Sequence, residues 1–319
     1  MVTNRKRANN MTLTLTANNY LEQVTPTFTD ELLKEYEQQI DNSPATIKTY
    51  MSCVKRFVSW INEKDINTVD YETVVIYKNH LRETMKAKAI NTHLTAIKDF
   101  FKFIERKGGR NVAKGVKKER VNNDFVRDSL TTEQVQQILN SIDQSTTDGA
   151  RAYAMFKLMV QTGLRECEIV RADINDIKTK GNNTVLYVQG KGETLKNNYV
   201  VLYPSVINAL QNYLKIRGAK GNEPLFTSTS NHNTNGRLTT RTVQRIIKKL
   251  YADNGIINDN ITTHSTRHTA VTLSILNGAD IMQAQAMARH KNINTTMIYF
   301  HNIDRLQNNA ESKLEQLFN

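Results

Sequence analysis

The chain has 319 residues, enough for two ordinary domains with buried cores. Its 43 lysines and arginines exceed its 31 aspartates and glutamates by 12, and such an excess favours a polyanionic partner, nucleic acid first. No run of about 18 apolar residues occurs, and Cys53 and Cys167 are too few for a disulfide framework or a zinc knuckle. We therefore expect neither a membrane span nor a disulfide scaffold, and we predict a cytoplasmic location.

Residues 1–26 form a polar N-terminal segment that is rich in asparagine and threonine and contains Arg5-Lys6-Arg7. Such a segment is either a flexible tail or a small arm that touches DNA, and the sequence leaves both interpretations open.

Residues 27–108 have helical periodicity throughout, with two clear helices and weaker ones at 29–42 and 70–84. Ser43 is a plausible N-cap before Pro44, and the last helix stops at a Gly-Gly pair, 108–109. This pattern predicts a compact four-helix domain. Lysines such as Lys48 and Lys98 lie on its polar faces; each alone would be an ordinary solvated side chain, but together they suit contact with a phosphate backbone.

Residues 109–128 break the helical pattern. The stretch is rich in glycine and basic residues and has no periodic apolar stripe, which indicates a linker. We expect this linker, through Lys117 and Lys118, to cross a DNA backbone between two domains.

Residues 129–303 predict a second, mainly helical domain, which opens with a capping box of Thr131 and Gln134. Two β-rich runs around a Gly/Lys/Asn turn near 183–203 predict a hairpin. A last helix is expected over 304–319, where it either covers its own core or docks on a neighbouring protomer. The fold class is thus mainly α with a small β-hairpin or sheet in the C-terminal domain.

Four of the seven histidines lie between residues 264 and 301. His264 and His268 are four apart at a helix start, so we considered a metal site. A metal is disfavoured because Arg267 would place a fixed cation beside it and no H-E-x-x-H motif is present. Arg267 and Arg165, which follows a glycine-terminated helix, are better suited to binding the oxygens of a phosphate.

Four motifs, "TGLRECEIVRADINDI", "QGKGETLKNNYVVL", "HSTRHTAV" and "ARHKNINTTMIYFH", resemble the motif boxes of the tyrosine recombinases, the family of phage-type integrases and Xer-type recombinases. The resemblance covers nearly the whole chain, with the boxes in the family's order and spacing. It implies a two-domain DNA clamp and a site-specific recombinase that works without ATP, divalent metal or another cofactor. Residue by residue, it implies these roles: Arg165 and Arg267 as catalytic arginines, Glu168 as the companion of Arg165, Lys191 as the catalytic lysine, His264 and His290 as catalytic histidines, and Tyr299 as the nucleophile.

The chain departs from the family pattern at two places. It reads Ala288-Arg289-His290 where the family commonly has Leu-Gly-His, and Ser265-Thr266 where the family commonly has an Asp/Lys-Leu pair. Neither departure removes a group that the chemistry needs. Lys196 lies in the same predicted hairpin as Lys191 and is a second candidate for the lysine. His268 and His301 are interpreted as structural.

The predicted chemistry starts from a weak nucleophile, because a free phenol has a pKa of about 10. Two arginines would stabilise the charge that builds on the phosphate when Tyr299 attacks. His264 would exchange the proton, His290 would hydrogen-bond the phosphate, and Lys191 would protonate the departing 5′-oxygen. The product would be a 3′-phosphotyrosyl enzyme with a free 5′-hydroxyl.

The segment 239–252 predicts a helix whose polar face carries Arg241, Gln244 and Arg245. That face is either simply solvated or, as the resemblance implies, in contact with bases and phosphates of double-stranded DNA. The resemblance also implies a dimer on each recombination site, a tetramer in the synaptic complex, and accessory proteins as further partners.

Two other functions remain open at this point. A type IB topoisomerase would use a similar set of residues to cleave and reseal one strand, and a non-catalytic DNA-binding regulator would use the arginines only to grip phosphate. The separate helical domain, the compact size and the C-terminal tail favour a recombinase, most simply an integrase or resolvase of a mobile element.

Overall fold

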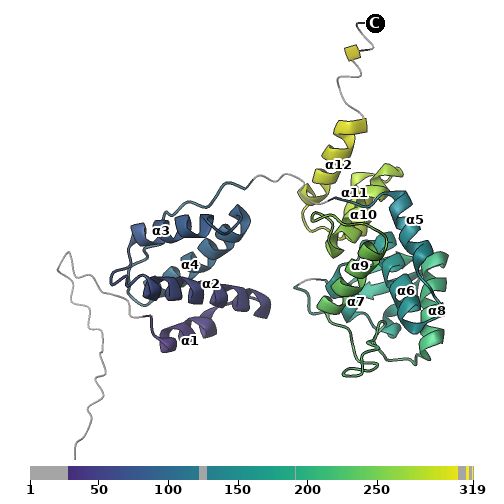
Figure 1. The fold of residues 1–319 in the computed structure, drawn as a ribbon, viewed down its shortest axis with the longest axis horizontal. Coiled ribbons are helices and arrows are strands. Elements are labelled where there is room, and N and C mark those ends of the chain that lie inside the picture. The colour runs from purple at the N-terminus through teal and green to yellow at the C-terminus, as the bar shows by residue number, and fades with distance from the viewer. Residues whose placement is uncertain (1–27, 122–127, 191, 308–313, 316–317, 319) are drawn as a thin grey trace, which may run out of the picture. The chain divides into compact units, whose positions relative to one another are not determined.

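The computed structural model describes residues 28–121, 128–190, 192–307, 314–315 and 318 (Figure 1). The chain divides into two compact units, Met1–Asn123 and Asp124–Asn319. The expected tail or arm, residues 1–26, lies outside the described residues. None of the described helices combines the length and the apolar character that a membrane crossing requires.

The N-terminal unit contains four helices, as predicted: α1 (Asp30–Gln39), α2 (Pro44–Glu63), α3 (Tyr71–Arg82) and α4 (Ala87–Arg106). The predicted cap of α2 is present, because the Ser43 hydroxyl accepts a hydrogen bond from the backbone N–H of Thr46 at 3.3 Å. Aromatic side chains dominate the core, in which Tyr36 packs edge-on against Phe100, and Phe57 against Tyr77.

The segment after α4 differs from the expected free linker. Val112, Ala113 and Val116 are buried in the core of the N-terminal unit. Glu119 receives a hydrogen bond from Arg82 at 2.8 Å, and its backbone N–H donates to the side chain of Asn91 at 2.7 Å. The first half of the predicted linker is therefore part of this unit. Its apolar residues are too few and too irregularly spaced to be recognised as core from periodicity.

The C-terminal unit is mainly helical with one small sheet, which confirms the predicted fold class. Its helices are α5 (Thr132–Ser141), α6 (Thr147–Thr162), α7 (Glu166–Arg171), the 3₁₀ helix η1 (Ile174–Asp176), α8 (Pro204–Arg217), α9 (Thr240–Asp253), α10 (Thr263–Leu276), α11 (Ile281–Ala288) and α12 (Asn294–Gln307). The predicted capping box of α5 forms: the Gln134 N–H donates to the Thr131 hydroxyl at 3.2 Å, and the Thr131 N–H donates to the Gln134 side chain at 2.9 Å. Helix α6 runs through the centre of this unit and packs against α8 and α10 (Figure 1).

The sheet has three antiparallel strands in the order β1 (Ile177–Lys180), β2 (Asn183–Val188) and β3 (Asn198–Leu202). The hairpin predicted near 183–203 corresponds to β2 and β3, in which Val185 pairs with Val201. Strand β1 was not predicted. It is an edge strand with three exposed residues out of four, so it lacks the apolar alternation that identifies a strand in a sequence.

The C-terminal helix begins earlier than expected. A single helix, α12, runs from Asn294 to Gln307, so residues 304–307 continue the helix that carries Tyr299 and no new helix begins at 304. The boundary predicted between a catalytic domain and a tail helix at 303/304 therefore falls inside α12. Nothing in the polar sequence 301–305 marks the helix as continuous.

Candidate active site

Arg165 lies in the sharp turn between α6 and α7. Gly163 caps α6 in the left-handed region, with φ 62°, which glycine adopts without strain. Arg165 is then the N-cap of α7 with extended backbone, and its side chain is 26 % exposed. The turn thus presents a partly accessible guanidinium at the edge of a well-packed helix pair.

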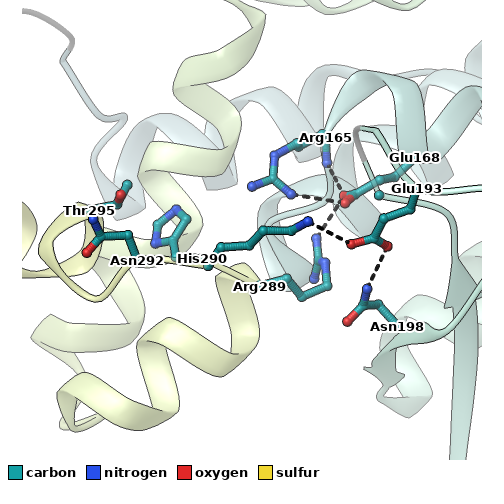
Figure 2. A pocket seen from close by; sticks show the side chains of 10 residues that line it. Arg165, Glu168, Glu193, Asn198, Arg289, His290, Asn292 and Thr295 are labelled. Carbon is teal, nitrogen blue, oxygen red and sulfur yellow. Dashed lines mark hydrogen bonds and ion pairs between the residues drawn. The ribbon is translucent and has the colours of Figure 1, made fainter. Parts of the chain in front are cut away.

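Glu168 orients Arg165. Its carboxylate is buried and accepts hydrogen bonds from the backbone N–H of Arg165 at 2.7 Å and from Nη1 of Arg165 at 3.1 Å (Figure 2). Burial opposes ionisation, but Arg289 and the Arg165 N–H outweigh it, so the pKa of Glu168 lies below its ordinary value. Glu168 is therefore a buried anion that holds Arg165 by two hydrogen bonds, one from its backbone N–H and one from its guanidinium.

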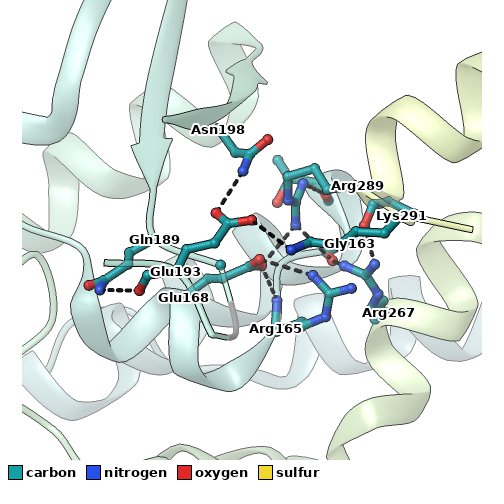
Figure 3. Close-up of polar contacts among 12 residues, drawn as sticks. Gly163, Arg165, Glu168, Gln189, Glu193, Asn198, Arg267, Arg289 and Lys291 are labelled. Carbon is teal, nitrogen blue, oxygen red and sulfur yellow. Dashed lines mark hydrogen bonds and ion pairs between the residues drawn. The ribbon is translucent and has the colours of Figure 1, made fainter. Parts of the chain in front are cut away.

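Arg267 lies on α10 and is only 2 % exposed. Its guanidinium donates to the carbonyl of Gly163 at 2.5 Å and to the carbonyl of Ala288 (Figure 3). Burial, followed by the charges of Arg165 and Arg289, lowers the pKa of Arg267 to about 9, which leaves it charged at neutral pH. Arg267 and Arg165 therefore both lie around the end of α6.

The two residues between His264 and Arg267, Ser265 and Thr266, make structural contacts. The hydroxyl of Ser265 accepts from the backbone N–H of Thr262 at 3.0 Å, which caps α10, and the hydroxyls of Thr266 and Tyr251 are 2.7 Å apart. These contacts explain how the chain uses this departure from the family pattern. His264 lies in the first turn of α10 and is partly exposed.

His290 follows α11 and is held by α12. Its Nδ1 lies 2.8 Å from the hydroxyl of Thr296, which is fully buried on the same helix as Tyr299. Burial, then the charges of Arg267 and Arg165, lowers the pKa of His290 to about 4. His290 is therefore neutral at physiological pH, with Nδ1 engaged by Thr296.

Tyr299 is 4 % exposed and packs beside Val271 and Ala288. Its hydroxyl is hydrogen-bonded to Nδ1 of His268. Its ring is nearly parallel to that of His290, with the centroids 6.3 Å apart. The structure thus places Tyr299 between two histidines within the unit that carries both arginines.

The pocket at this site has a volume of about 500 Å³ and is lined by Arg165, Glu193, Arg289, His290 and neighbouring residues (Figure 2). Glu193, from the β2–β3 connection, accepts a hydrogen bond from Asn198 at 2.8 Å. The Lys291 ammonium lies 3.6 Å from the other carboxylate oxygen of Glu193. The β2–β3 connection and the segment after α11 therefore face each other across the pocket.

Lys191, the predicted catalytic lysine, lies outside the described residues, although Gly190 before it lines the pocket. Lys196, the second candidate, forms ion pairs with Asp173 at 2.7 Å and Asp176 at 2.5 Å. Burial alone would lower the pKa of Lys196, but these two carboxylates raise it above its ordinary value. The ammonium of Lys196 is thus held by two carboxylates and joins the β2–β3 connection to η1, which leaves Lys191 as the better candidate.

The predicted DNA-contacting residues of α9 form an exposed row of Arg241, Gln244 and Arg245. Gln244 donates to the carboxylate of Glu166 at 2.7 Å, so this row lies beside the first residue of α7, which follows Arg165.

Of the predicted lysine contacts, Lys98 and Lys118 both lie in the N-terminal unit, where the charge of Lys118 acts on Lys98. The pKa of Lys98 lies below its ordinary value, mainly because of burial and then because of the charges of Lys118, Lys102 and Lys78. Lys117 is exposed beside Lys118. Lys48 lines a different groove, on α2.

Two residues of the site were not assigned a catalytic role from the sequence. His268, interpreted as structural, contacts the hydroxyl of Tyr299. Its position directly after Arg267, one helical turn from His264, was the only available signal. Arg289, noted as a departure from the family pattern, lines the pocket and bonds Glu168 at 2.8 Å. Among the described residues, no group of three His, Cys, Asp or Glu side chains is placed to hold a metal ion.

Comparison with known proteins connects this geometry to a family. The phage integrase family model matches residues 128–305, and the model of the phage integrase N-terminal SAM-like domain matches residues 29–108. Tyrosine recombinase XerC of Caldanaerobacter subterraneus subsp. tengcongensis is 28 % identical over 322 residues, covering 90 % of this chain and 86 % of that protein.

Two solved structures show the same fold. The XerH site-specific recombinase bound to a palindromic difH substrate in a post-cleavage complex has a TM-score of 0.69 at 20 % identity, covering 89 % of this chain and 84 % of that one. A lambda integrase tetramer bound to a Holliday junction has a TM-score of 0.66 at 18 % identity, covering 84 % and 76 %. The chain belongs to the phage integrase family, the tyrosine-type site-specific recombinases.

Proposed function

We propose that this tyrosine recombinase breaks and rejoins DNA through Tyr299, with Arg165 and Arg267 as the arginines that bind the scissile phosphate. The observation that supports this most directly is that both guanidinium groups are anchored around the end of α6, Arg267 on Gly163 and Arg165 through Glu168 (Figure 3). Tyr299 packs against Ala288, whose carbonyl accepts from Arg267. A regulator that merely grips DNA would not require a tyrosine at this place.

In the proposed cleavage step the Tyr299 oxygen attacks the phosphorus, and the bond from phosphorus to the 5′-oxygen breaks. Arg165 and Arg267 stabilise the negative charge on the nonbridging oxygens. Neutral His290, with Nδ1 accepting from Thr296, carries its proton on Nε2 and donates it in a hydrogen bond to the phosphate. The product is a 3′-phosphotyrosyl bond and a free 5′-hydroxyl, and attack by a second 5′-hydroxyl reverses the step on a new partner.

Two proton transfers accompany this step. The Tyr299 proton passes to His264, which lies in the first turn of α10. The Tyr299 hydroxyl contacts His268, and the ring of His268 lies 4.9 Å from that of His264. The departing 5′-oxygen takes its proton from Lys191 in the β2–β3 connection. The step requires no metal, ATP or redox cofactor, because the protein's own charges and protons balance it.

The DNA partner is double-stranded and is contacted by both units in this proposal. Helix α9 contacts DNA through Arg241, Gln244 and Arg245, beside the turn that carries Arg165. Lys98, Lys117, Lys118 and Lys48 contact the phosphate backbone from the N-terminal unit. The lambda integrase neighbour is a tetramer on a Holliday junction, and we propose a dimer on each site and a tetramer at synapsis, with accessory proteins as further partners and a mobile element as the setting.

A trapping experiment tests this proposal. Nicked duplexes with randomised sequence are incubated with the full chain and with Tyr299→Phe, and species that survive denaturant are recovered and sequenced. We expect the wild type to form a covalent adduct on a defined sequence, and Tyr299→Phe to bind DNA without forming one. If wild type and Tyr299→Phe give only noncovalent complexes, the chain is a DNA-binding regulator.

A further inference from the structure

Arg289 is a charged residue in a backbone conformation that suits glycine. It caps α11 in the left-handed region, with φ 52° and ψ 46°. A β-carbon makes this conformation unfavourable, and the family commonly has glycine here. Strain of this kind persists where the surrounding structure uses the side chain that causes it.

The guanidinium of Arg289 joins the supports of the two catalytic arginines. Its Nη2 donates to Glu168 at 2.8 Å, the same carboxylate that orients Arg165 (Figure 3). Nη2 also lies 3.3 Å from the carbonyl of Gly163, which accepts from Arg267 as well. Arg289 thus bonds both the carboxylate of Glu168, which accepts from Arg165, and the carbonyl of Gly163, which accepts from Arg267.

The terminal N–H groups of Arg289 are used by the protein. Nη1 donates to the carbonyl of Met287 at 2.7 Å and makes a longer contact of 3.5 Å to the carbonyl of Thr162. With the two bonds of Nη2, each terminal N–H has an acceptor, whereas Nε is buried without a hydrogen-bond partner among the described residues. The side chain is 8 % exposed, and its terminal N–H groups all point at protein acceptors, so they are not available to a phosphate.

Arg165 and Arg267 differ in this respect. Among the described residues, the terminal nitrogens of Arg165 make one hydrogen bond and those of Arg267 make two, which leaves N–H groups on both for a phosphate. We propose that Arg289 is a positioning residue, which ties Glu168 to Gly163 and so holds Arg165 and Arg267 at a fixed separation around the scissile phosphate. This inference rests on the proposed function.

The electrostatics of the site agree with this geometry. Two guanidinium groups, those of Arg165 and Arg289, pair with the buried carboxylate of Glu168, and Arg267 adds a third positive charge to the site. Arg289 therefore makes the site more positive while Glu168 still orients Arg165. With glycine at 289, Glu168 would face Arg165 alone, and more of the charge of Arg165 would be neutralised by the protein. A net positive site is what an anionic transition state requires.

The test compares Arg289→Gly with the wild type on the nicked duplex recovered from the wild-type adduct. Glycine keeps the left-handed backbone and removes the guanidinium. We expect adduct formation at saturating protein to slow by roughly 10- to 100-fold, because misplaced groups reduce rates by this order. DNA affinity, measured in the Tyr299→Phe background, should change less than about threefold, since Arg289 does not touch DNA in this proposal. Asn235→Gly is the matched control, because Asn235 also has a left-handed backbone (φ 60°), is exposed, and lies in the loop before α9.

Two further variants make the result decisive. If Arg289 acts through Glu168, adding Arg289→Gly to Glu168→Gln should slow cleavage much less than it slows the wild type. Arg289→Lys keeps the charge but cannot reach all four acceptors, so it should still lose about tenfold or more. If Arg289→Gly does not fold, Arg289→Lys decides alone.

Wild-type rates in Arg289→Gly or Arg289→Lys would overturn the inference. The absence of any adduct with the wild type would instead overturn the proposed function.

Discussion

The hydroxyl of Tyr299 is hydrogen-bonded to Nδ1 of His268, the residue that directly follows Arg267 on α10. The proposed nucleophile is therefore held by an imidazole while it is 4 % exposed. Because the bond joins α12 to α10, it fixes the helix that carries Tyr299 against the helix that carries Arg267.

We predict that His268→Ala destabilises the C-terminal unit by about 1–3 kcal/mol, because it leaves a nearly buried phenol hydroxyl without this partner. In a double-mutant cycle with Tyr299→Phe, the two losses should be coupled by about 1 kcal/mol. Urea unfolding of the four proteins measures this. His232→Ala, at an exposed position, is the control and should change stability by less than about 0.5 kcal/mol. Strictly additive losses would show that the bond contributes nothing to stability.

Glu168→Gln should destabilise the protein by roughly 3 kcal/mol at pH 7, because it removes the carboxylate between two buried or half-buried guanidinium groups. The folded pKa of Glu168 lies below the ordinary value of 4.5. Its stabilisation is therefore complete above that value and is lost as the pH falls through the folded pKa. Urea midpoints measured from pH 7 down to pH 3 should show the gap between wild type and variant closing on acidification. A gap that is constant with pH would contradict the charged role of Glu168.

His290 should remain neutral through the physiological range. Its folded pKa of about 4 lies below the ordinary 6.5, so acidification between these values protonates the unfolded chain first and lowers stability. Ring chemical shifts in NMR spectra should report neutral His290 at pH 6, and His290→Gln should weaken the pH dependence of stability between 6.5 and 4. A titration midpoint near 6.5 would show that the surrounding arginines and burial do not act as described.

Lys191→Ala should lower the cleavage rate, whereas Lys196→Ala should mainly lower stability. Loss of a general acid costs roughly 10²- to 10⁴-fold in rate, and Lys191→Ala should recover on a duplex whose bridging 5′-oxygen is replaced by sulfur, since a thiolate leaves without a proton. Lys196 is bound to Asp173 and Asp176, so Lys196→Ala should mainly lower stability and gain nothing from sulfur. If the sulfur-containing duplex restored cleavage by Lys196→Ala and not by Lys191→Ala, Lys196 would be the general acid and Lys191 the structural residue.

Removing residues 308–319, after the end of α12 at Gln307, should leave adduct formation on a single site intact and weaken assembly and strand exchange. A cut at 305 is less informative, because it shortens the helix that carries Tyr299. Gel-shift titration and sizing of complexes with paired sites measure the two properties. Full strand exchange by the shortened protein would show that the tail covers its own unit or is dispensable.

The sequence by itself determined most of the elements, though not β1 or the start of α12, and the reactive residue types. Local signals such as the Ser43 and Thr131 caps, Gly163 at the end of α6, and the apolar stripes of α2 and α4 depend on neighbouring residues only, and the structure reproduces them. The motif boxes carried the family and the candidate residues Arg165, His264, Arg267, His290 and Tyr299. These candidates are what the resemblance implies; the box with His264 and Arg267 lies within α10, whereas the box with His290 and Tyr299 runs from the end of α11 into α12.

Only the tertiary structure decided which groups meet. Val112 and Val116 join a core, Lys196 meets Asp173, and His268 meets Tyr299 through packing of segments distant in sequence. The largest difference between the sequence pattern and the structure concerns Arg289, which the sequence shows only as a charged residue at a position where the family commonly has glycine. Its side chain contacts the C-terminal end of α6 and a buried carboxylate on α7, and burial removes the competing water that would otherwise satisfy both charges. Long-range contacts of this kind depend on where helices pack, which local residue patterns do not encode.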